Sequence, residues 1–228
     1  PGVAIRLFPG KEHRFVVRFS GEGLSDALTD ADPQKDHKKP AYAEPLSPEA
    51  GPAARVVNQF LDDVSRVLSD RTVANAALLR GFSKFPSIPG FTDLYKVRAA
   101  AIANYPMYKG LARLLGMDVK DAGPTTADLF STLESCYSDY DFFYVHFKKT
   151  DAAGEDGNDD VKVAAIEDLD AFLPRIEALN PDVLAVTADH STPCSLKGHS
   201  WHPNPFMIVA ASAMPDDVAD FAERPFSR

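Results

Sequence analysis

Cysteine and positive charge are both scarce in this 228-residue sequence. The two cysteines, Cys136 and Cys194, lie far apart and outside any Cys-x-x-Cys pattern, so a disulfide scaffold is not expected and a reducing cytoplasm fits best. The 24 lysines and arginines are outnumbered by 33 aspartates and glutamates, for a net charge of −9. Such an acidic chain argues against a nucleic-acid or anionic-membrane partner. It does not argue against a phosphorylated substrate, because bound cations can reverse the local field.

Several sequence features of other protein classes are also missing. No apolar run approaches the about 20 residues that a membrane-spanning helix needs. The sequence contains no Gly-rich phosphate loop of the P-loop or dinucleotide type and no nucleophile elbow. No secretory signal is visible, although the chain begins at Pro1 and not at a methionine, so the cytoplasmic location is an inference.

The apolar residues that are present alternate between strand and helix patterns. A strand at 14–19 precedes an irregular segment that runs to Pro48, and a helix is predicted at about 52–69. Short apolar runs and amphipathic stretches then alternate, which predicts a mostly parallel sheet covered on both faces. The further predicted strands are 76–79, 98–103, 141–147, 183–187 and 206–210, and the further predicted helices are 107–115, 129–137 and 163–179.

Two of the predicted strands, 141–147 and 183–187, end in clusters of acidic and imidazole side chains. Ligands of open parallel α/β sheets bind beyond the carboxyl ends of the strands, where both clusters lie. Carboxylates and imidazoles together suit divalent ions such as Mn²⁺ or Zn²⁺. The side chains of these clusters are Asp151, Glu155, Asp189, His190, His199 and His202.

Each of these features also has an ordinary structural explanation. The segment 151–157 has the composition of a common loop, and an Asp-His pair often only caps or hydrogen-bonds. His146 alternates with aromatic residues inside a predicted strand, so we predict a structural role for it. From the residues alone, a metallo-hydrolase or metallo-transferase is predicted, and a purely structural interpretation stays open.

Several further segments, spread in order over almost the whole chain, are motifs of one known family. They are Gly21-Glu22-Gly23-Leu24-Ser25-Asp26, Thr29-Asp30-Ala31-Asp32-Pro33, Leu79-Arg80-Gly81, Phe85-Pro86-Ser87-Ile88-Pro89, Ala100 to Ile102, Tyr105-Pro106-Met107-Tyr108-Lys109-Gly110, Thr150-Asp151-Ala152-Ala153-Gly154 and Thr187-Ala188-Asp189-His190-Ser191-Thr192-Pro193. On these segments the sequence resembles the archaeal-type cofactor-independent phosphoglycerate mutases of the alkaline phosphatase superfamily. The resemblance implies a three-layer α/β/α core with a smaller inserted α+β domain.

This resemblance implies two divalent metal ions, first of all Mn²⁺, with Mg²⁺, Co²⁺ or Zn²⁺ as alternatives, and no 2,3-bisphosphoglycerate. The family's first ion would be held by Asp151, Glu155 and His199. Glu155 stands where related enzymes often have histidine, and a carboxylate there lowers the preference for zinc. The second ion would be held by Asp189 and His190 together with an upstream Asp and a nucleophilic Ser, and nothing in this chain matches those two residues.

The implied reaction moves a phosphoryl group between O2 and O3 of glycerate through a phosphoserine, so the implied partner is a small phosphoglycerate. Arg80 is the first candidate for substrate binding, followed by Lys109 and Arg18. Residues 1–70 are predicted to be part of the inserted domain that closes over the substrate, and residues 71–228 the C-terminal part of the core.

Because the nucleophilic Ser is missing, we predict that these residues are a fragment that is shortened at both ends and has little catalytic activity alone. Two other interpretations remain open at this point. One is another enzyme of the superfamily, such as a phosphatase, a sulfatase-like hydrolase or a phosphonate-processing enzyme. The other is a non-catalytic binding or scaffold module.

Overall fold

The computed structural model describes residues 2–10, 13–35 and 37–223 and divides into two compact units, Pro1–Ile88 and Pro89–Arg228. The units are described one at a time. The first unit extends past residue 70, where the sequence analysis places its boundary, because Leu79 is buried in its core. Within the described residues, no helix is both long and apolar enough to span a bilayer.

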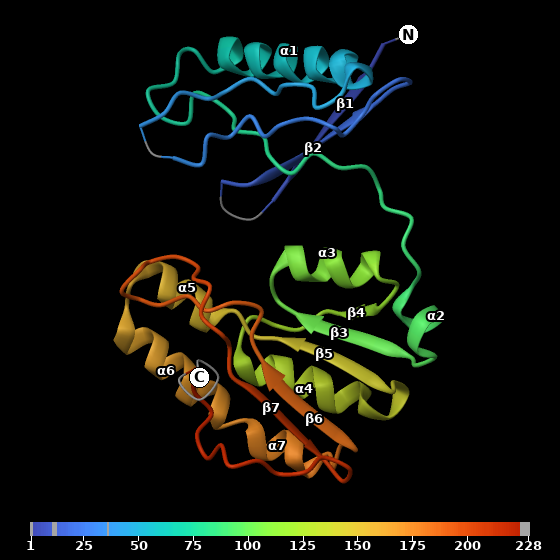
Figure 1. Ribbon diagram of the computed structural model, residues 1–228, viewed down its shortest axis with the longest axis vertical. Coiled ribbons are helices and arrows are strands. Elements are labelled where there is room, and N and C mark those ends of the chain that lie inside the picture. Colours follow the sequence, from blue (N-terminus) through green and yellow to red (C-terminus); the bar gives the residue numbers. More distant parts are fainter. Residues whose placement is uncertain (1, 11–12, 36, 224–228) are drawn as a thin grey trace. The chain divides into compact units, whose positions relative to one another are not determined.

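The first unit combines a β-hairpin with one long helix (Figure 1). Strand β1 (Ala4–Pro9) pairs antiparallel with β2 (Phe15–Ser20), and the short 3₁₀ helix η1 (Pro48–Ala50) leads into α1 (Gly51–Val67). The helix predicted at 52–69 is thus confirmed to within two residues. It forms because its apolar residues recur on one face, and these side chains are buried in the unit's core: Ala53, Ala54, Val57, Phe60 and Leu61.

The strand predicted at 76–79 is wrong. The structure has no strand there, although the carbonyl oxygen of Leu79 accepts a hydrogen bond from the Ala31 backbone N–H at 2.8 Å. Leu79 is 6% exposed and packs against the core of the first unit. A four-residue apolar run is therefore explained by one anchoring side chain in an extended segment and not by a sheet.

The second unit is built on a parallel sheet with the strand order β4-β3-β5. The strands are β3 (Ala99–Ala103), β4 (Asp118–Lys120) and β5 (Phe142–His146). All five residues of the central strand β3 are buried, and four are alanines, so helices can approach both faces closely. The strands predicted at 98–103 and 141–147 are confirmed, as is the α/β fold class.

Helices cover both faces of this sheet (Figure 1). On one face α3 (Pro106–Leu114) contributes Ala112 to a cluster with Ala99 and Ala101. On the other face α4 (Thr126–Cys136) packs its apolar side chains around Ile102, and side chains from α6 (Asp159–Asp170) and α7 (Leu173–Ala178) join them. The smaller helices α2 (Phe91–Tyr95) and η2 (Tyr137–Asp139) precede β3 and β5.

The predicted helix at 163–179 is two helices, α6 (Asp159–Asp170) and α7 (Leu173–Ala178). Their apolar residues follow one continuous pattern, but Pro174 lies in the first turn of α7. A proline has no backbone N–H to continue a helix and is favoured at the start of one, so the chain breaks here. Both helices still turn apolar side chains to the same cluster as α4.

The last two strands form a separate pair. Strand β6 (Val183–Thr187) pairs antiparallel with β7 (Phe206–Ala210), and both strands lie at their predicted positions. The parallel pairing predicted for most of the sheet is found in β4-β3-β5 and not in this pair. Helix α5 (Lys149–Asp156) follows β5 directly. It was not predicted as a helix, because its residues have the composition of a loop.

The ion pair between Arg98, just before β3, and Asp141, just before β5, predicts a contribution to folding stability that is lost in acid. Arg98 donates from Nε and Nη2 to both carboxylate oxygens of Asp141, at 3.1 and 2.9 Å, and from its backbone N–H at 2.9 Å. These hydrogen bonds lower the pKa of Asp141 to about 2. Because the folded pKa is depressed below the ordinary value of about 3.9, the contribution is present above about pH 4 and is lost as pH falls towards 2.

We therefore expect Asp141→Asn to destabilise the chain at pH 6 and to have little effect near pH 2. Urea unfolding at steps between these pH values measures the difference. Asp170→Asn, at another exposed acid in the second unit, serves as the matched control. A pH profile of Asp141→Asn parallel to that of the unaltered chain would contradict the assignment.

Candidate metal centre

The first group of candidate ligands lies on α5, just beyond the carboxyl end of β5. Asp151 and Glu155 are four residues apart on this helix, so their side chains share one face. Gly157 ends the helix in the left-handed conformation, with φ of 69°, which lets the chain turn sharply into α6. The local sequence thus presents two carboxylates side by side at the sheet edge.

The second group lies on the loop between β6 and β7, and hydrogen bonds join the two ends of this loop. The Ser200 backbone N–H donates to the Ser191 carbonyl at 2.9 Å. The Ser191 hydroxyl donates to Asn204 Oδ1 at 2.9 Å, and the amide of Asn204 donates to the Ala188 carbonyl at 3.1 Å. These bonds close the loop and hold the two candidate histidines that it carries.

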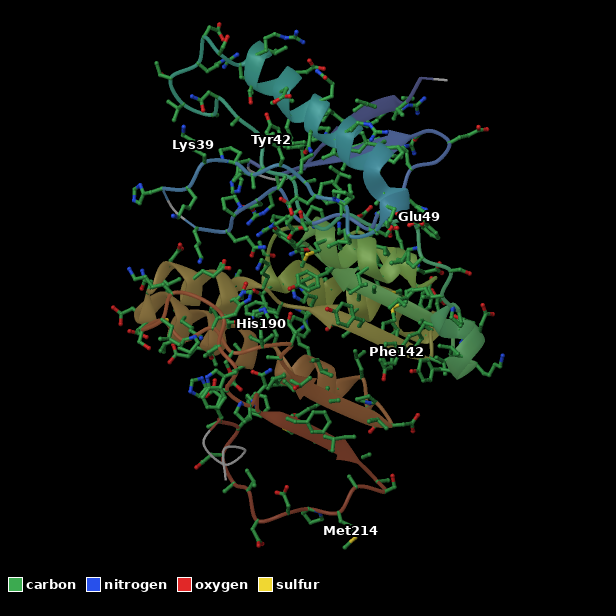
Figure 2. All side chains as sticks on the ribbon, turned by 45° about the horizontal axis from the view of Figure 1, so that its top comes forward. Lys39, Tyr42, Glu49, Phe142, His190 and Met214 are labelled. Carbon is green, nitrogen blue, oxygen red and sulfur yellow. The ribbon has the colours of Figure 1, made fainter. Side chains whose placement is uncertain are left out.

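The carboxylates and the histidines lie within a few ångströms of one another, and one of the histidines, His190, is labelled in Figure 2. His199 Nε2 lies 3.7 Å from Asp151 Oδ1 and 3.6 Å from Glu155 Oε1. His190 Nε2 lies 3.6 Å from Asp189 Oδ2, and its Nδ1 lies 3.9 Å from Asp151 Oδ1. The two imidazole rings stack, with centroids 3.7 Å apart.

The charge state of Asp151 suits a metal ligand. Partial burial raises the pKa of this carboxyl, but hydrogen bonds from Lys148 and Thr192 lower it by more, so the pKa lies below its usual range. Lys148 pairs with Oδ2, whereas Oδ1 faces the two histidines and the Thr192 hydroxyl. One carboxylate oxygen is therefore neutralised by a lysine, and the other points towards the imidazoles.

This donor set fits a divalent ion. One atom each from Asp151, His190 and His199 lies within 4.8 Å of the others. Ligands at about 2.1 Å from one ion stand about 3 to 3.5 Å apart, and the carboxylate–imidazole distances here are 3.6 to 3.9 Å. Carboxylates with imidazoles are also the chemistry that Mn²⁺ and Zn²⁺ accept.

The structure brings together every predicted metal ligand, but it does so more tightly than two separate groups. His199 Nε2 lies close to both Asp151 and Glu155, its predicted partners, whereas the three donors that all lie within 4.8 Å of one another are Asp151, His190 and His199. Asp189 and His190, predicted as the other set, lie beside each other, and His190 also lies beside Asp151. How the five donors divide between two ions stays a prediction.

The predicted substrate-binding residues lie in both units. Arg80 and Arg18 belong to the first unit, where Arg80 follows the extended segment in place of the predicted strand and lies 3.8 Å from Asp32. The Arg18 guanidinium lies over the Phe8 ring at 5.7 Å. Lys109, on α3 of the second unit, pairs with Asp121 at 2.8 Å. Their role in substrate binding stays a prediction.

Three residues near the ligands were missed by the sequence analysis. Lys148 and Thr192 each lie within three residues of a candidate ligand, and that spacing is the signal that could have found them. Tyr108 gave no such signal. Its hydroxyl lies 3.4 Å from Asp189 Oδ2, and its ring stacks on His146 at 3.5 Å.

His146 and His202, the other two histidines near the clusters, are not in the ligand group. His146 is the half-buried stacking partner of Tyr108, and burial lowers its pKa, which favours a neutral ring. His202 Nδ1 lies 2.9 Å from the Ser200 hydroxyl. The ring stack agrees with the structural role predicted for His146.

Two protein-family models match the chain that carries this group of ligands. The model of the metalloenzyme superfamily matches residues 69–223, which carry all five candidate ligands. The chain belongs to the metalloenzyme superfamily. A second family model, that of 2,3-bisphosphoglycerate-independent phosphoglycerate mutase, matches residues 1–74.

Individual members of the family agree with the models. A relative from Thermosipho africanus, named "Probable 2,3-bisphosphoglycerate-independent phosphoglycerate mutase", is 57% identical over 208 residues, which are 91% of this chain and 52% of the relative. A relative of the same name from Thermus thermophilus is 48% identical over 99% of this chain and 56% of its own length. This metalloenzyme chain therefore spans about half the length of the curated relatives it matches.

A solved structure of a cofactor-independent mutase has a similar fold. The cofactor-independent phosphoglycerate mutase from Thermoplasma acidophilum is similar with a TM-score of 0.62 and 29% identity, over 97% of this chain and 59% of that one. The resemblance to the cofactor-independent mutases, and the alkaline-phosphatase-like fold class that it implies, are thereby confirmed.

Proposed function

We propose that this chain is the metal-binding part of a 2,3-bisphosphoglycerate-independent phosphoglycerate mutase. Such an enzyme interconverts 3-phosphoglycerate and 2-phosphoglycerate through a phosphoserine, whose Ser lies outside these residues. The observation that carries the proposal is the convergence of Asp151, Glu155 and His199 with Asp189 and His190 from two distant segments. Relatives that bear the name of this enzyme align over about nine tenths of the chain.

Asp151, Glu155 and His199 would hold one divalent ion, and Asp189 and His190 would hold part of a second. Two such ions supply positive charge that stabilises a transferring phosphoryl group and activates a hydroxyl nucleophile. We propose Mn²⁺, because a carboxylate at Glu155 favours a harder ion than zinc. Lys148 keeps Asp151 ionised and oriented by pairing with the oxygen that faces away from the histidines.

Cationic side chains would bind the two anionic ends of the substrate. Arg80 is the first candidate and Arg18 another, both in the first unit, which we propose as part of the closing lid domain, with the core formed by the second unit. Lys109 would have to exchange its present partner, Asp121, for the substrate. We also propose a cytoplasmic location, which the two free, buried cysteines support.

A chimaera tests the proposal. This chain replaces the matching 208-residue segment of the Thermosipho africanus relative, which supplies the remainder of the protein. We expect Mn²⁺-dependent conversion of 3-phosphoglycerate to 2-phosphoglycerate without added 2,3-bisphosphoglycerate, followed through coupled enolase. The chimaera with Asp151→Asn should lose that activity, and the one with Asp170→Asn should keep it. A folded but inactive chimaera beside an active parent would refute the proposal.

A further inference from the structure

The Thr192 side chain lies between the two groups of candidate ligands. Its hydroxyl donates to Asp151 Oδ1 at 2.7 Å and lies 3.1 Å from His190 Nδ1. The residue is 4% exposed, so water does not compete for these contacts. One buried hydroxyl thus touches a carboxylate from α5 and an imidazole from the β6–β7 loop.

The direction of both hydrogen bonds follows from proton counting. A hydroxyl has one proton to donate, and an ionised carboxylate can only accept. Asp151 is ion-paired with Lys148, so the Thr192 proton goes to Asp151. The oxygen of Thr192 can then only accept from His190, and Nδ1 of that ring must carry a proton.

This choice decides which nitrogen of His190 is available to a metal. A neutral imidazole protonated on Nδ1 has its lone pair on Nε2. Nε2 is the atom that lies 3.6 Å from Asp189 Oδ2, whereas Nδ1 is the one that faces Asp151 at 3.9 Å. An unprotonated Nδ1 would present its lone pair on the side of Asp151, whereas an unprotonated Nε2 presents its lone pair on the side of Asp189.

We propose that Thr192 is a positioning residue that fixes His190 in its Nδ1-protonated tautomer and so assigns its Nε2 to the Asp189 side of the metal centre. The inference rests on the proposed metal function. Hydrogen bonds to the second nitrogen of a ligating histidine commonly set its tautomer and orientation. Here the same hydroxyl also holds Asp151, so it fixes one donor from each group.

The backbone of Thr192 is held firmly enough for this task. Its carbonyl oxygen accepts a hydrogen bond from Lys162 Nζ, on α6, at 2.7 Å. Thr192 also packs closely against α5 at Gly154, where the absence of a side chain leaves room for the Thr192 carbonyl oxygen. The hydroxyl is therefore placed by two helices and not by the loop alone.

The tautomer can be read directly from the full chain. Long-range ¹H–¹⁵N correlation spectra of ¹⁵N-histidine-labelled protein at about pH 8, where imidazoles are neutral, distinguish Nδ1–H from Nε2–H. The His190 signals are assigned by their loss in His190→Gln. We expect His190 to be protonated on Nδ1. Protonation on Nε2 would overturn the proposal whatever the variants do.

Variants at Thr192 test the consequence for metal binding. Thr192→Val keeps the shape and removes the hydroxyl, and we expect it to weaken Mn²⁺ binding by about 10- to 100-fold in titration calorimetry and to give a mixture of tautomers. Thr192→Ser restores the hydroxyl and should bind within about threefold of the unaltered chain, since Ser and Thr offer the same donor and acceptor. Circular dichroism confirms folding.

The outcomes separate this inference from the function on which it rests. Equal Mn²⁺ affinity in folded Thr192→Val and unaltered chain would overturn the role of Thr192 and leave the metal centre standing. No Mn²⁺ binding by the unaltered chain would overturn the proposed function itself, and with it the assignment of His190 as a donor.

Discussion

Replacing Asp151 by asparagine should weaken Mn²⁺ binding by at least about 100-fold, which at about 1.4 kcal/mol per tenfold is about 2.8 kcal/mol. Asparagine has the same shape, so the effect isolates the charge. Oδ1 of Asp151 lies 3.9 Å from His190 Nδ1 and 3.7 Å from His199 Nε2. A single charge pair at about 4 Å is worth about 4 kcal/mol at an effective dielectric of about 20, which exceeds the loss we expect.

The substitution also leaves a cation without its partner. Lys148 pairs with Asp151 Oδ2, and in Asp151→Asn its ammonium group faces a neutral amide while it still repels an incoming ion. The loss of attraction and the uncompensated repulsion act in the same direction. The expected effect is therefore larger than for Glu155→Gln, because the Glu155 side chain is half exposed and its charge is screened by water.

Calorimetric titration of the full chain with Mn²⁺ measures this effect. Asp170→Asn removes an exposed carboxylate at the end of α6, in the same unit, and should leave the affinity unchanged. Thermal unfolding without metal shows whether the variant remains folded. If Asp151→Asn bound Mn²⁺ as tightly as the control, the group of Asp151, Glu155 and His199 would not be a metal site.

Much of the second unit could be predicted from the sequence, because most of its strands are short apolar runs between polar turns. The errors have specific causes. Pro174 interrupts a helical pattern that is otherwise continuous from α6 to α7. Strand β4 was missed because it has only three residues, and β1 because all its side chains are exposed and no buried face marks it.

The candidate ligands could also be found in the sequence, since each stands in a short motif at the end of a predicted strand. Their arrangement could not. The distance of 3.9 Å between His190 Nδ1 and Asp151 Oδ1 depends on the closed β6–β7 loop and on the contact of this loop with α5. Thr192 carries no charge and lies in a common turn sequence, so only its position between two ligands reveals its importance.

Gly154→Ala should both destabilise the chain and weaken its metal centre, which is the reverse of the usual result for this change within a helix. A Cβ at Gly154 would lie 2.2 Å from the Thr192 carbonyl oxygen and 3.0 Å from its Cγ2. No real Cβ tolerates the first distance, so α5 and the loop must separate. Overpacking of this kind costs about 1 to 3 kcal/mol, and the movement would draw the Thr192 hydroxyl away from Asp151.

The matched control is Gly110→Ala, within α3, where an added Cβ meets nothing within 4 Å. Alanine is favoured over glycine inside a helix by about 0.5 to 1 kcal/mol, so this control should stabilise the chain and leave Mn²⁺ affinity unchanged. Urea unfolding gives the free energies, and calorimetric titration gives the affinities. For Gly154→Ala we expect at least about a tenfold loss of affinity, the range for displaced supporting residues.

The two substitutions are expected to change the free energy of unfolding in opposite directions, which makes the result specific. If Gly154→Ala behaved like Gly110→Ala, the close approach of α5 to Thr192 would not exist in solution, and the placement of that hydroxyl would lose its support. If Gly154→Ala were destabilised but bound Mn²⁺ normally, the contact would be structural only. Loss of both stability and affinity would link Gly154 to the metal centre, because the helix has a poor helix former at a position that the Thr192 backbone approaches closely.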